Sequence, residues 1–181
     1  MMRGLVFGIL CGAAAWLAPS HAQAFEREWH VGGGVGITAY PNYYGAGPSL
    51  GLNAGYGISD VFDLKLELLG SSHSYRASGT SPTEHGQSYS AAAGLSYKLD
   101  ILQWIPYGAA LVGFQHIAGP LPASEPFRRD DAIVAGILGL DYAATRSFGL
   151  GVSLRMNLLL SSIGEGEAIT TMLRAEYHWG C

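Results

Sequence analysis

Cysteine and charge are both scarce in this 181-residue chain. It has two cysteines, Cys11 and Cys181, and only 13% of its residues are Asp, Glu, Lys or Arg. That charged fraction is about half the share found in an ordinary soluble domain. Cys11 lies in an N-terminal segment that we expect to be removed, so a disulfide within the mature chain is excluded. The formal net charge of −4 argues against nucleic acid or another acidic partner.

Long hydrophobic runs are also missing beyond the first segment of the chain. Residues 1–24 combine Arg3, an apolar stretch over residues 5–17 and an A-x-A site that ends at Ala24, the pattern of a secretory signal peptide. The apolar stretch is shorter than the ~20 residues of a membrane-spanning helix. We therefore expect a cleaved signal peptide over 1–24 and one domain over 25–181.

Glycine is frequent in the sequence, and the polarity of its residues alternates along the chain. It has 26 glycines, and apolar and polar residues alternate with the period of two that is typical of β-strands. A chain that is apolar overall but has no long apolar run indicates a membrane β-barrel, because each strand turns only one face to lipid. Eight segments fit such a strand: 28–39, 48–59, 62–71, 88–99, 103–117, 131–142, 148–160 and 168–179.

The segment 103–117 alternates poorly. Tyr107 and Leu111 fit one apolar face, whereas Val112 falls on the other. We expect a β-bulge near Gly113, since one extra residue would reconcile the two halves of the strand.

Connections between the segments alternate in length. The expected tight turns are 59–60, 100 and 144–146, and the expected long, polar stretches are 41–47, 72–86, 118–130 and 161–167. This rhythm predicts short periplasmic turns, long extracellular loops and both termini in the periplasm.

Aromatic residues gather at both ends of the segments. The short-turn side has Trp29, Tyr56, Phe62, Tyr97, Tyr107, Tyr142, Phe148, Tyr177 and Trp179, and the long-loop side has Tyr40, Tyr43, Tyr44, Tyr75, Tyr89, Phe114 and Phe127. Two such belts are expected where aromatic rings meet lipid headgroups. A soluble sandwich or lipocalin-type barrel would hide its apolar face inside. We predict an all-β fold, namely an eight-stranded antiparallel up-and-down transmembrane β-barrel.

The whole mature chain resembles the small eight-stranded outer-membrane barrels of the OmpA and OmpX type. The resemblance lies in the eight alternating segments, the rhythm of the connections, the opening Pro106-Tyr107-Gly108-Ala109 of one strand and the aromatic end Tyr177-His178-Trp179. It implies a monomer in the outer membrane of a Gram-negative cell envelope, in contact with outer-membrane lipid and lipopolysaccharide. It also implies help from the barrel assembly machinery and periplasmic chaperones. The end departs from the family pattern, because Gly180 and Cys181 follow the last aromatic residue.

The polar faces of the strands would line the barrel lumen. Eight charged residues belong to them: Asp63, Lys65, Glu67, Lys98, Asp141, Arg155, Arg174 and Glu176. Unpaired buried charge is costly, so we expect these residues to pair into a network that plugs the lumen. The alternative is a narrow, porin-like channel for small solutes, with charges that exchange partners and lumenal glycines that leave space for water. An eight-stranded barrel has room only for side chains or one small ligand.

Two histidines fall on the strands that must pair to close the barrel. His30 and His178, with Glu28 and Glu176, are residue types that bind metal ions. Packing in the lumen is the favoured explanation of these residues, and we expect no metal and no cofactor.

A lipid A deacylase-like enzyme is a second alternative. His116, Ser88, Ser90 and Glu84 lie near the long-loop ends of neighbouring segments. A catalytic triad needs hydrogen-bond reach between nucleophile, base and orienting acid, and the sequence establishes none. We therefore expect no catalytic residues.

The long loops are the remaining place for function. Arg76, Arg128 and Arg129 carry the planar guanidinium group that suits phosphate, so they are candidates for contact with lipopolysaccharide. The sequence thus predicts a structural or surface-interaction role.

Overall fold

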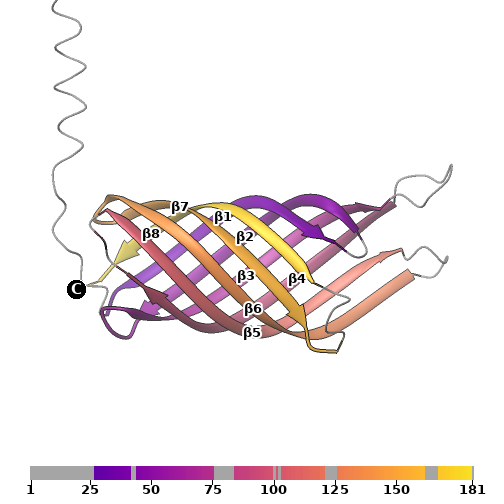
Figure 1. Cartoon of the computed structure of the whole chain (residues 1–181), viewed down its shortest axis with the longest axis horizontal. Coiled ribbons are helices and arrows are strands. Elements are labelled where there is room, and N and C mark those ends of the chain that lie inside the picture. Colours follow the sequence, from indigo (N-terminus) through magenta and orange to yellow (C-terminus); the bar gives the residue numbers. More distant parts are fainter. Residues whose placement is uncertain are drawn as a thin grey trace, which may run out of the picture.

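The computed structural model describes residues 27–41, 44–75, 84–99, 101, 103–120, 126–161 and 167–180. Regular structure in these residues consists of β1 (Trp29–Tyr40), β2 (Tyr44–Gly57), β3 (Phe62–Tyr75), β4 (Glu84–Lys98), β5 (Trp104–Pro120), β6 (Pro126–Thr145), β7 (Phe148–Leu159) and β8 (Ala168–Trp179). Each strand pairs antiparallel with the next, and β8 pairs with β1, which closes the sheet into a barrel (Figure 1). The predicted all-β, eight-stranded up-and-down barrel is confirmed.

The first and last strands close the barrel in a defined register. Trp29 lies opposite Trp179, His30 opposite His178, and Gly32 opposite Glu176. A slip by one residue would turn every lipid-facing side chain of a strand into the lumen, so the alternation of faces fixes this register.

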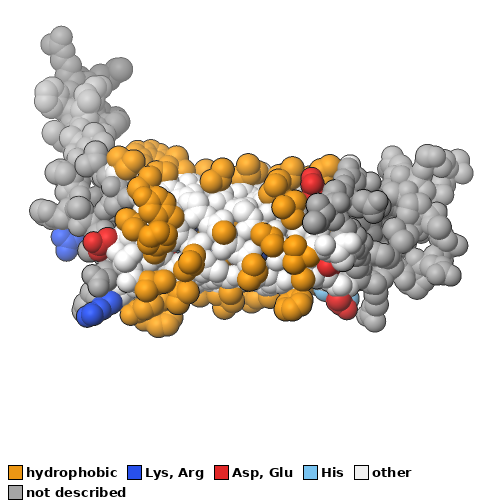
Figure 2. All heavy atoms as spheres, turned by 60° about the horizontal axis from the view of Figure 1, so that its bottom comes forward, with side chains coloured by type: hydrophobic (Ala, Val, Ile, Leu, Met, Phe, Trp, Pro, Cys, Tyr) orange, Lys and Arg blue, Asp and Glu red, His pale blue; other side chains and the backbone are white. Residues whose placement is uncertain are grey.

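Outward-facing side chains of the barrel are apolar and exposed. Leu52, Val112 and Leu173 are 57%, 66% and 65% exposed. Figure 2 shows hydrophobic side chains spread over the barrel wall, with the charged ones near the two ends of that face. Soluble monomers rarely expose continuous apolar surface of this extent, so the wall is suited to lipid. The described residues include no helix of the length and hydropathy needed to span a membrane.

Aromatic rings pair on the outer wall at the end with the short connections. The pairs are Trp29–Tyr56, Phe62–Tyr97 and Trp104–Tyr142, with ring centroids 4.8, 5.3 and 5.0 Å apart. The assignment of Tyr40 and Tyr107 to the aromatic belts is wrong, because both point into the lumen and are only 3% and 5% exposed. Both fall on inward positions, and the phase of the alternation decides the face of a strand residue.

The predicted bulge near Gly113 is wrong, since β5 is regular there. Gly113 pairs with Ala92 of β4 and with Ile133 of β6 without a shift in register. Val112 faces outward, and Leu111 faces inward with 1% exposure. The alternation of β5 is hidden in the sequence because both of its faces are apolar.

Several strands extend into the stretches that were expected to be long loops. β2 begins at Tyr44, β3 continues to Tyr75, and β4 begins at Glu84. Between β5 and β6, only residues 121–125 remain outside the strands. The alternation continues through His73, which was placed in a loop but is an inward-facing residue of β3 with 1% exposure. Hydrogen bonds to the neighbouring strands satisfy the backbone N–H and C=O groups of these extensions. The strands are therefore longer, and the connections between them shorter, than predicted.

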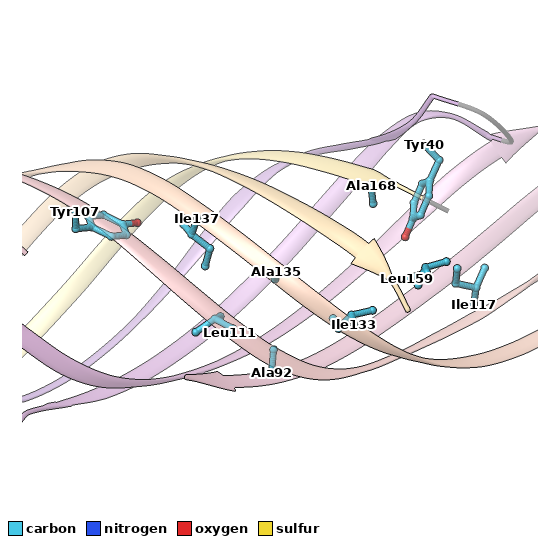
Figure 3. Packing of buried hydrophobic residues seen from close by; sticks show 10 residues of the cluster. All are labelled: Tyr40, Ala92, Tyr107, Leu111, Ile117, Ile133, Ala135, Ile137, Leu159 and Ala168. Carbon is cyan, nitrogen blue, oxygen red and sulfur yellow. The ribbon is translucent and has the colours of Figure 1, made fainter. Parts of the chain in front are cut away.

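A cluster of buried hydrophobic residues lies inside the barrel. Its members are Tyr40, Ala92, Tyr107, Leu111, Ile117, Ile133, Ala135, Ile137, Leu159 and Ala168 (Figure 3). Most of them come from β5 and β6, and they extend along the barrel from Tyr107 and Ile137 to Tyr40 and Ile117. The lumen therefore has a largely apolar side formed by these two strands, and most of the buried polar side chains face it from the other strands.

Candidate functional site in the barrel lumen

The eight charged residues predicted to line the lumen all occupy inward-facing positions. Seven of them are buried, and Glu67 keeps 12% of its side chain exposed. Inward placement follows from the alternation of their strands, because a charged side chain on the other face would enter lipid. The structure brings six of them into ion pairs that form two groups, one at the short-connection end of the barrel and one near its middle.

The first group lies where β1, β3, β4 and β8 meet at the short-connection end. Lys98 Nζ lies 2.5 Å from Asp63 Oδ2, and His30 Nε2 lies 3.3 Å from the same oxygen. Arg174 forms an ion pair with Glu176, two residues away on β8. Both carboxylates thus have a basic partner, which offsets the cost of their burial.

The histidines of the closing strands lie within this first group. The His30 and His178 rings are stacked with centroids 5.7 Å apart. His178 Nδ1 lies 3.7 Å from Glu28 Oε2, and His178 Nε2 lies 3.8 Å from Glu176 Oε2. In the described part of the chain, no three His, Cys, Asp or Glu side chains are grouped so that they could hold a metal ion.

Tyr107 lies close to two cations in the lumen. Lys65 Nζ and Arg174 Cζ each lie 4.9 Å from the centroid of its ring, a distance at which cation–π attraction operates. The ring lies over Gly139 of the neighbouring strand, where a β-carbon would overlap it. Glycine at 139 therefore makes room for the Tyr107 ring in the position from which it reaches both cations.

The second group centres on Arg155, whose side chain is 2% exposed. It forms an ion pair with Glu67 across the lumen, from β7 to β3. Its Nε donates to Asn157 Oδ1 at 2.7 Å, and Asn157 Nδ2 donates to Gln115 Oε1 at 3.2 Å. Arg155 is thus held by partners on two sides, and its charge is matched by Glu67.

Hydrogen bonds continue from Gln115 toward the other end of the barrel. Gln115 Nε2 donates to Tyr40 Oη at 2.7 Å, and Tyr40 Oη donates to Ser88 Oγ at 2.7 Å. Ser71 Oγ then links Ser88, at 2.7 Å, to His73 Nε2, at 2.8 Å. We call the whole chain from Glu67 and Arg155 to His73 the cross-lumen network. It joins β1, β3, β4, β5 and β7 through buried side chains.

Sequence reasoning missed three residues of the cross-lumen network. Tyr40 was assigned to an aromatic belt and His73 to a loop, and Gln115 lies in a strand whose faces could not be told apart. The available signal was the period of two, which places Tyr40 in phase with His30 and His73 in phase with Asp63.

Asp141 belongs to neither group of ion pairs. It lines a small cavity of about 10 Å³ at the short-connection end, together with Lys98, Glu176 and His178. A cavity of ~10–15 Å³ is the least that holds one water molecule. The Asp141 carboxylate fills the space beside Gly151, where a β-carbon would overlap it.

Several lumenal glycines are covered by larger side chains. A β-carbon at Gly55 would overlap the His30 imidazole, and one at Gly51 would lie 2.7 Å from the terminal carbon of Met172. These glycines therefore make room for bulky neighbours.

Comparison with known proteins decides what kind of barrel this is. The family model described as Outer membrane protein beta-barrel domain matches residues 7–175. The chain belongs to that family. Its place is accordingly the outer membrane, and its strands are transmembrane strands. No curated protein matches the sequence.

Solved structures of small outer-membrane barrels share the fold of this family member. OprG from Pseudomonas aeruginosa has a TM-score of 0.72 and 13% identity, with 90% of this chain and 100% of OprG covered. Neisserial surface protein A has a TM-score of 0.66 and 17% identity, with coverage of 82% and 96%. Ail, the attachment invasion locus protein of Yersinia pestis, has a TM-score of 0.61 and 16% identity, with coverage of 85% and 99%. At these identities the likeness shows the fold alone.

The residues considered for a deacylase-like site lie on different faces of this outer-membrane barrel. His116 faces outward, and its Nδ1 lies 2.6 Å from Asp130 Oδ1. Ser88 and Ser90 face the lumen and are 5% and 8% exposed. These two serines and His116 therefore lie on opposite faces of the barrel wall, and the side chain of Glu84 lies outside the described residues.

The three arginines proposed for surface contacts are not described at the side-chain level. Arg76 lies outside the described residues, and Arg128 and Arg129 are described only as backbone of β6. Contact of these arginines with lipopolysaccharide therefore stays a prediction.

Proposed function

We propose that this protein is a structural, non-enzymatic outer-membrane barrel whose lumen is closed by its own side chains and whose loops interact at the cell surface. The observation that carries the closed lumen is the cross-lumen network, which runs from β3 to β7 through the Glu67–Arg155 ion pair. The apolar cluster of β5 and β6 supports the same proposal from the opposite side of the lumen.

Opening such a lumen would cost free energy in two ways. Moving Arg155 away from Glu67 leaves a buried charge without its partner, which typically costs about 3–5 kcal/mol. Displacing Leu111 or Ile133, each 1% exposed, removes packing contacts inside the barrel. The Glu67–Arg155 pair and the Leu111 and Ile133 side chains lie in the same section of an eight-stranded barrel. The interior of such a barrel is only wide enough for side chains.

Conductance in planar lipid bilayers tests the closed lumen. The refolded mature protein is expected to show no steady conductance, whereas the double variant Arg155→Ala, Leu111→Ala is expected to show small, discrete openings. Steady, ion-selective openings of the unaltered protein would reject the closed lumen and favour the narrow channel. The continuous polar side of the lumen is the observation that supports this alternative, because ions could follow exchanging partners.

The surface role rests on the loops. We propose that the termini lie in the periplasm, and that Arg76, Arg128 and Arg129 contact phosphates of lipopolysaccharide at the other end. We further propose that the barrel is a monomer that reaches the membrane with periplasmic chaperones and the barrel assembly machinery. The triple arginine-to-alanine variant is expected to bind lipopolysaccharide more weakly and with less dependence on salt. Unchanged binding would reject the contact.

The absence of enzymatic activity is also a proposal. Its support is the separation of Ser88 and Ser90 from His116 by the barrel wall. Incubation with lipid A is expected to release no fatty acid, measured by mass spectrometry. Release that disappears in the His116→Ala variant would overturn this proposal and establish the deacylase-like alternative.

A further inference from the structure

The two strands that close the barrel bring two histidines side by side in the lumen. His30 of β1 lies opposite His178 of β8, and their rings are stacked with centroids 5.7 Å apart. His30 is 3% exposed, whereas the His178 side chain keeps 12% of its surface exposed at the short-connection end. We call these two residues the histidine pair. An ordinary histidine changes its charge between pH 5 and 8, so two such groups meet at the closing seam.

The barrel wall leaves the histidine pair little room. A β-carbon at Gly55 of β2 would overlap the His30 imidazole, so this ring lies directly against the β2 backbone. A β-carbon at Gly149 of β7 would lie 3.7 Å from His178 Nε2, an ordinary contact on the other side of the pair. The wall on both sides therefore limits how far the two rings can separate while β1 and β8 stay paired.

Glu176 is the carboxylate that the two histidines share. Its Oε2 atom lies 3.8 Å from His30 Nδ1 and 3.8 Å from His178 Nε2. Its other oxygen, Oε1, pairs with Arg174 and accepts a hydrogen bond from Asn53 Nδ2 at 2.5 Å. A single carboxylate oxygen thus faces both imidazoles, and it can balance the charge of one of them.

The remaining carboxylates favour a charge on His178 over a charge on His30. The second ring nitrogen of His178, Nδ1, lies 3.7 Å from Glu28 Oε2. His30 Nε2 lies 3.3 Å from Asp63 Oδ2, but Lys98 Nζ lies 2.5 Å from the same oxygen. A proton on His30 would therefore meet a carboxylate that already has a cationic partner.

Other charged groups at this end of the lumen leave an imbalance of one charge. Asp141 of β6 lines the small cavity beside His178, and Tyr107 of β5 lies between this end and the middle of the barrel. The buried charged side chains described around the pair are the carboxylates of Glu28, Asp63, Asp141 and Glu176 and the cations of Lys65, Lys98 and Arg174. The carboxylates outnumber the cations by one, so a single imidazolium balances the group and a second one does not.

We propose that the histidine pair is a pH-sensitive switch in the closing seam of the barrel. The seam stays closed with one proton on the pair, and a second proton places two positive charges 5.7 Å apart and loosens β1 from β8. Stability is therefore lost as the pH falls through the range in which an ordinary histidine becomes charged. The switch lies in the seam itself, so it does not depend on whether the lumen conducts or on what the loops contact.

Urea unfolding in lipid vesicles at about pH 8 and about pH 5.5 tests the proposal. The midpoint of the unaltered protein is expected to be lower by about 0.5–1 M at the lower pH. His30→Gln and His178→Gln each leave one imidazole, so either variant is expected to remove most of this fall. The double variant is expected to remove no more than a single one, because only the second charge is repelled.

The His116→Gln variant is the matched control. It removes an imidazole that faces outward and pairs with the exposed Asp130, so it is expected to leave the fall unchanged. The carboxylates of the lumen titrate in every variant, and the comparison between variants therefore isolates the contribution of the histidine pair.

Hydrogen exchange measured by mass spectrometry shows where the barrel loosens. After correction for intrinsic exchange rates, amides of β1 and β8 are expected to open about tenfold more often at the lower pH. Amides of β4 and β5, on the other side of the barrel, are expected to change little.

Three results would overturn the proposal. They are a fall in the midpoint that persists in both single variants, a fall that is halved in each and lost only in the double variant, and an equal increase in exchange in all strands. An NMR titration of the imidazoles in the unaltered protein keeps the proposal testable if a variant does not fold. The two rings are expected to titrate in two separate steps, and a single common step would contradict the switch.

Discussion

Replacing Glu67 with leucine tests whether the Arg155 ion pair holds the lumen together. The Arg155 side chain is 2% exposed, so the variant leaves a guanidinium in the lumen with Asn157 and Ser90 as neutral partners. Breaking a buried ion pair typically costs about 3–5 kcal/mol. Because 12% of the Glu67 side chain is exposed, we expect a loss near the lower end, about 3 kcal/mol.

Urea unfolding in lipid vesicles measures this loss through tryptophan fluorescence. Trp29, Trp104 and Trp179 are exposed on the outer wall, so their emission reports whether the barrel is inserted. With a denaturant slope of about 1–3 kcal/mol per molar, the midpoint is expected to fall by about 1–3 M, and the slope itself is expected to stay constant. Asp130→Asn, at an exposed ion pair, serves as the control and is expected to cost less than about 1 kcal/mol.

The double variant Glu67→Leu, Arg155→Met decides whether the two residues act as a pair. Replacing both members of a buried ion pair with apolar residues of similar volume is often neutral, so the double variant is expected within about 1 kcal/mol of the unaltered protein. The interaction free energy from the cycle would then be about as large as the losses in the two single variants, Glu67→Leu and Arg155→Met, added together. If the double variant instead loses the sum of the two single losses, the reasoning about the cross-lumen pair is refuted.

Three further outcomes are expected. Gly139→Val should destabilise the barrel by about 1–3 kcal/mol in the same urea titration, because its side chain overlaps the Tyr107 ring, and adding Tyr107→Ala should restore part of the loss; no restoration would refute the packing argument. Leu111→Ala should cost about 2–5 kcal/mol, whereas Leu138→Ala, at a position that is 68% exposed to lipid, should cost less; equal losses would contradict the assignment of faces. A membrane-impermeant maleimide should label Cys181 only after the outer membrane of cells is permeabilised, and labelling of intact cells would reverse the proposed orientation.

The strand number and the outer faces of most strands could be predicted because their alternation survives in the sequence. In β7, Leu150, Val152 and Leu154 alternate with small or polar residues, and the structure exposes these three side chains. Charge also carried information, since residues such as Asp63 and Arg155 could occupy only the lumenal face. Period and charge were therefore sufficient wherever the two faces differ in polarity.

The faces of β5 could not be predicted, because its two faces have the same polarity. Leu111 and Val112 are both aliphatic, yet one packs in the lumen and the other contacts lipid. Only the pairing of β5 with β4 and β6 decides which of them faces the lumen. The alternation within a single strand does not reveal that pairing.

The sequence also could not predict which of the lumenal charged residues pair with one another. Arg155 and Glu67 lie on strands that are not neighbours in the sheet, so their meeting depends on how far the strands tilt and stagger around the barrel. Asp63 meets Lys98 between adjacent strands, and Arg174 meets Glu176 on one strand. Opposite charges can satisfy one another in all three ways, so composition alone does not choose among them.

Glycines that face the lumen and glycines that face lipid occur for different reasons. At Gly55 and Gly139 a β-carbon would overlap a side chain inside the barrel, so packing alone accounts for glycine there. At Gly70 the nearest atom to a β-carbon would be in the Tyr89 ring at 3.5 Å, an ordinary contact, and at Gly136 there would be none within 4 Å. Nothing within the protein therefore excludes a side chain at Gly70. The consequence of glycine at this position lies on the lipid side of the wall, where it lowers the surface between Leu50 and Tyr89.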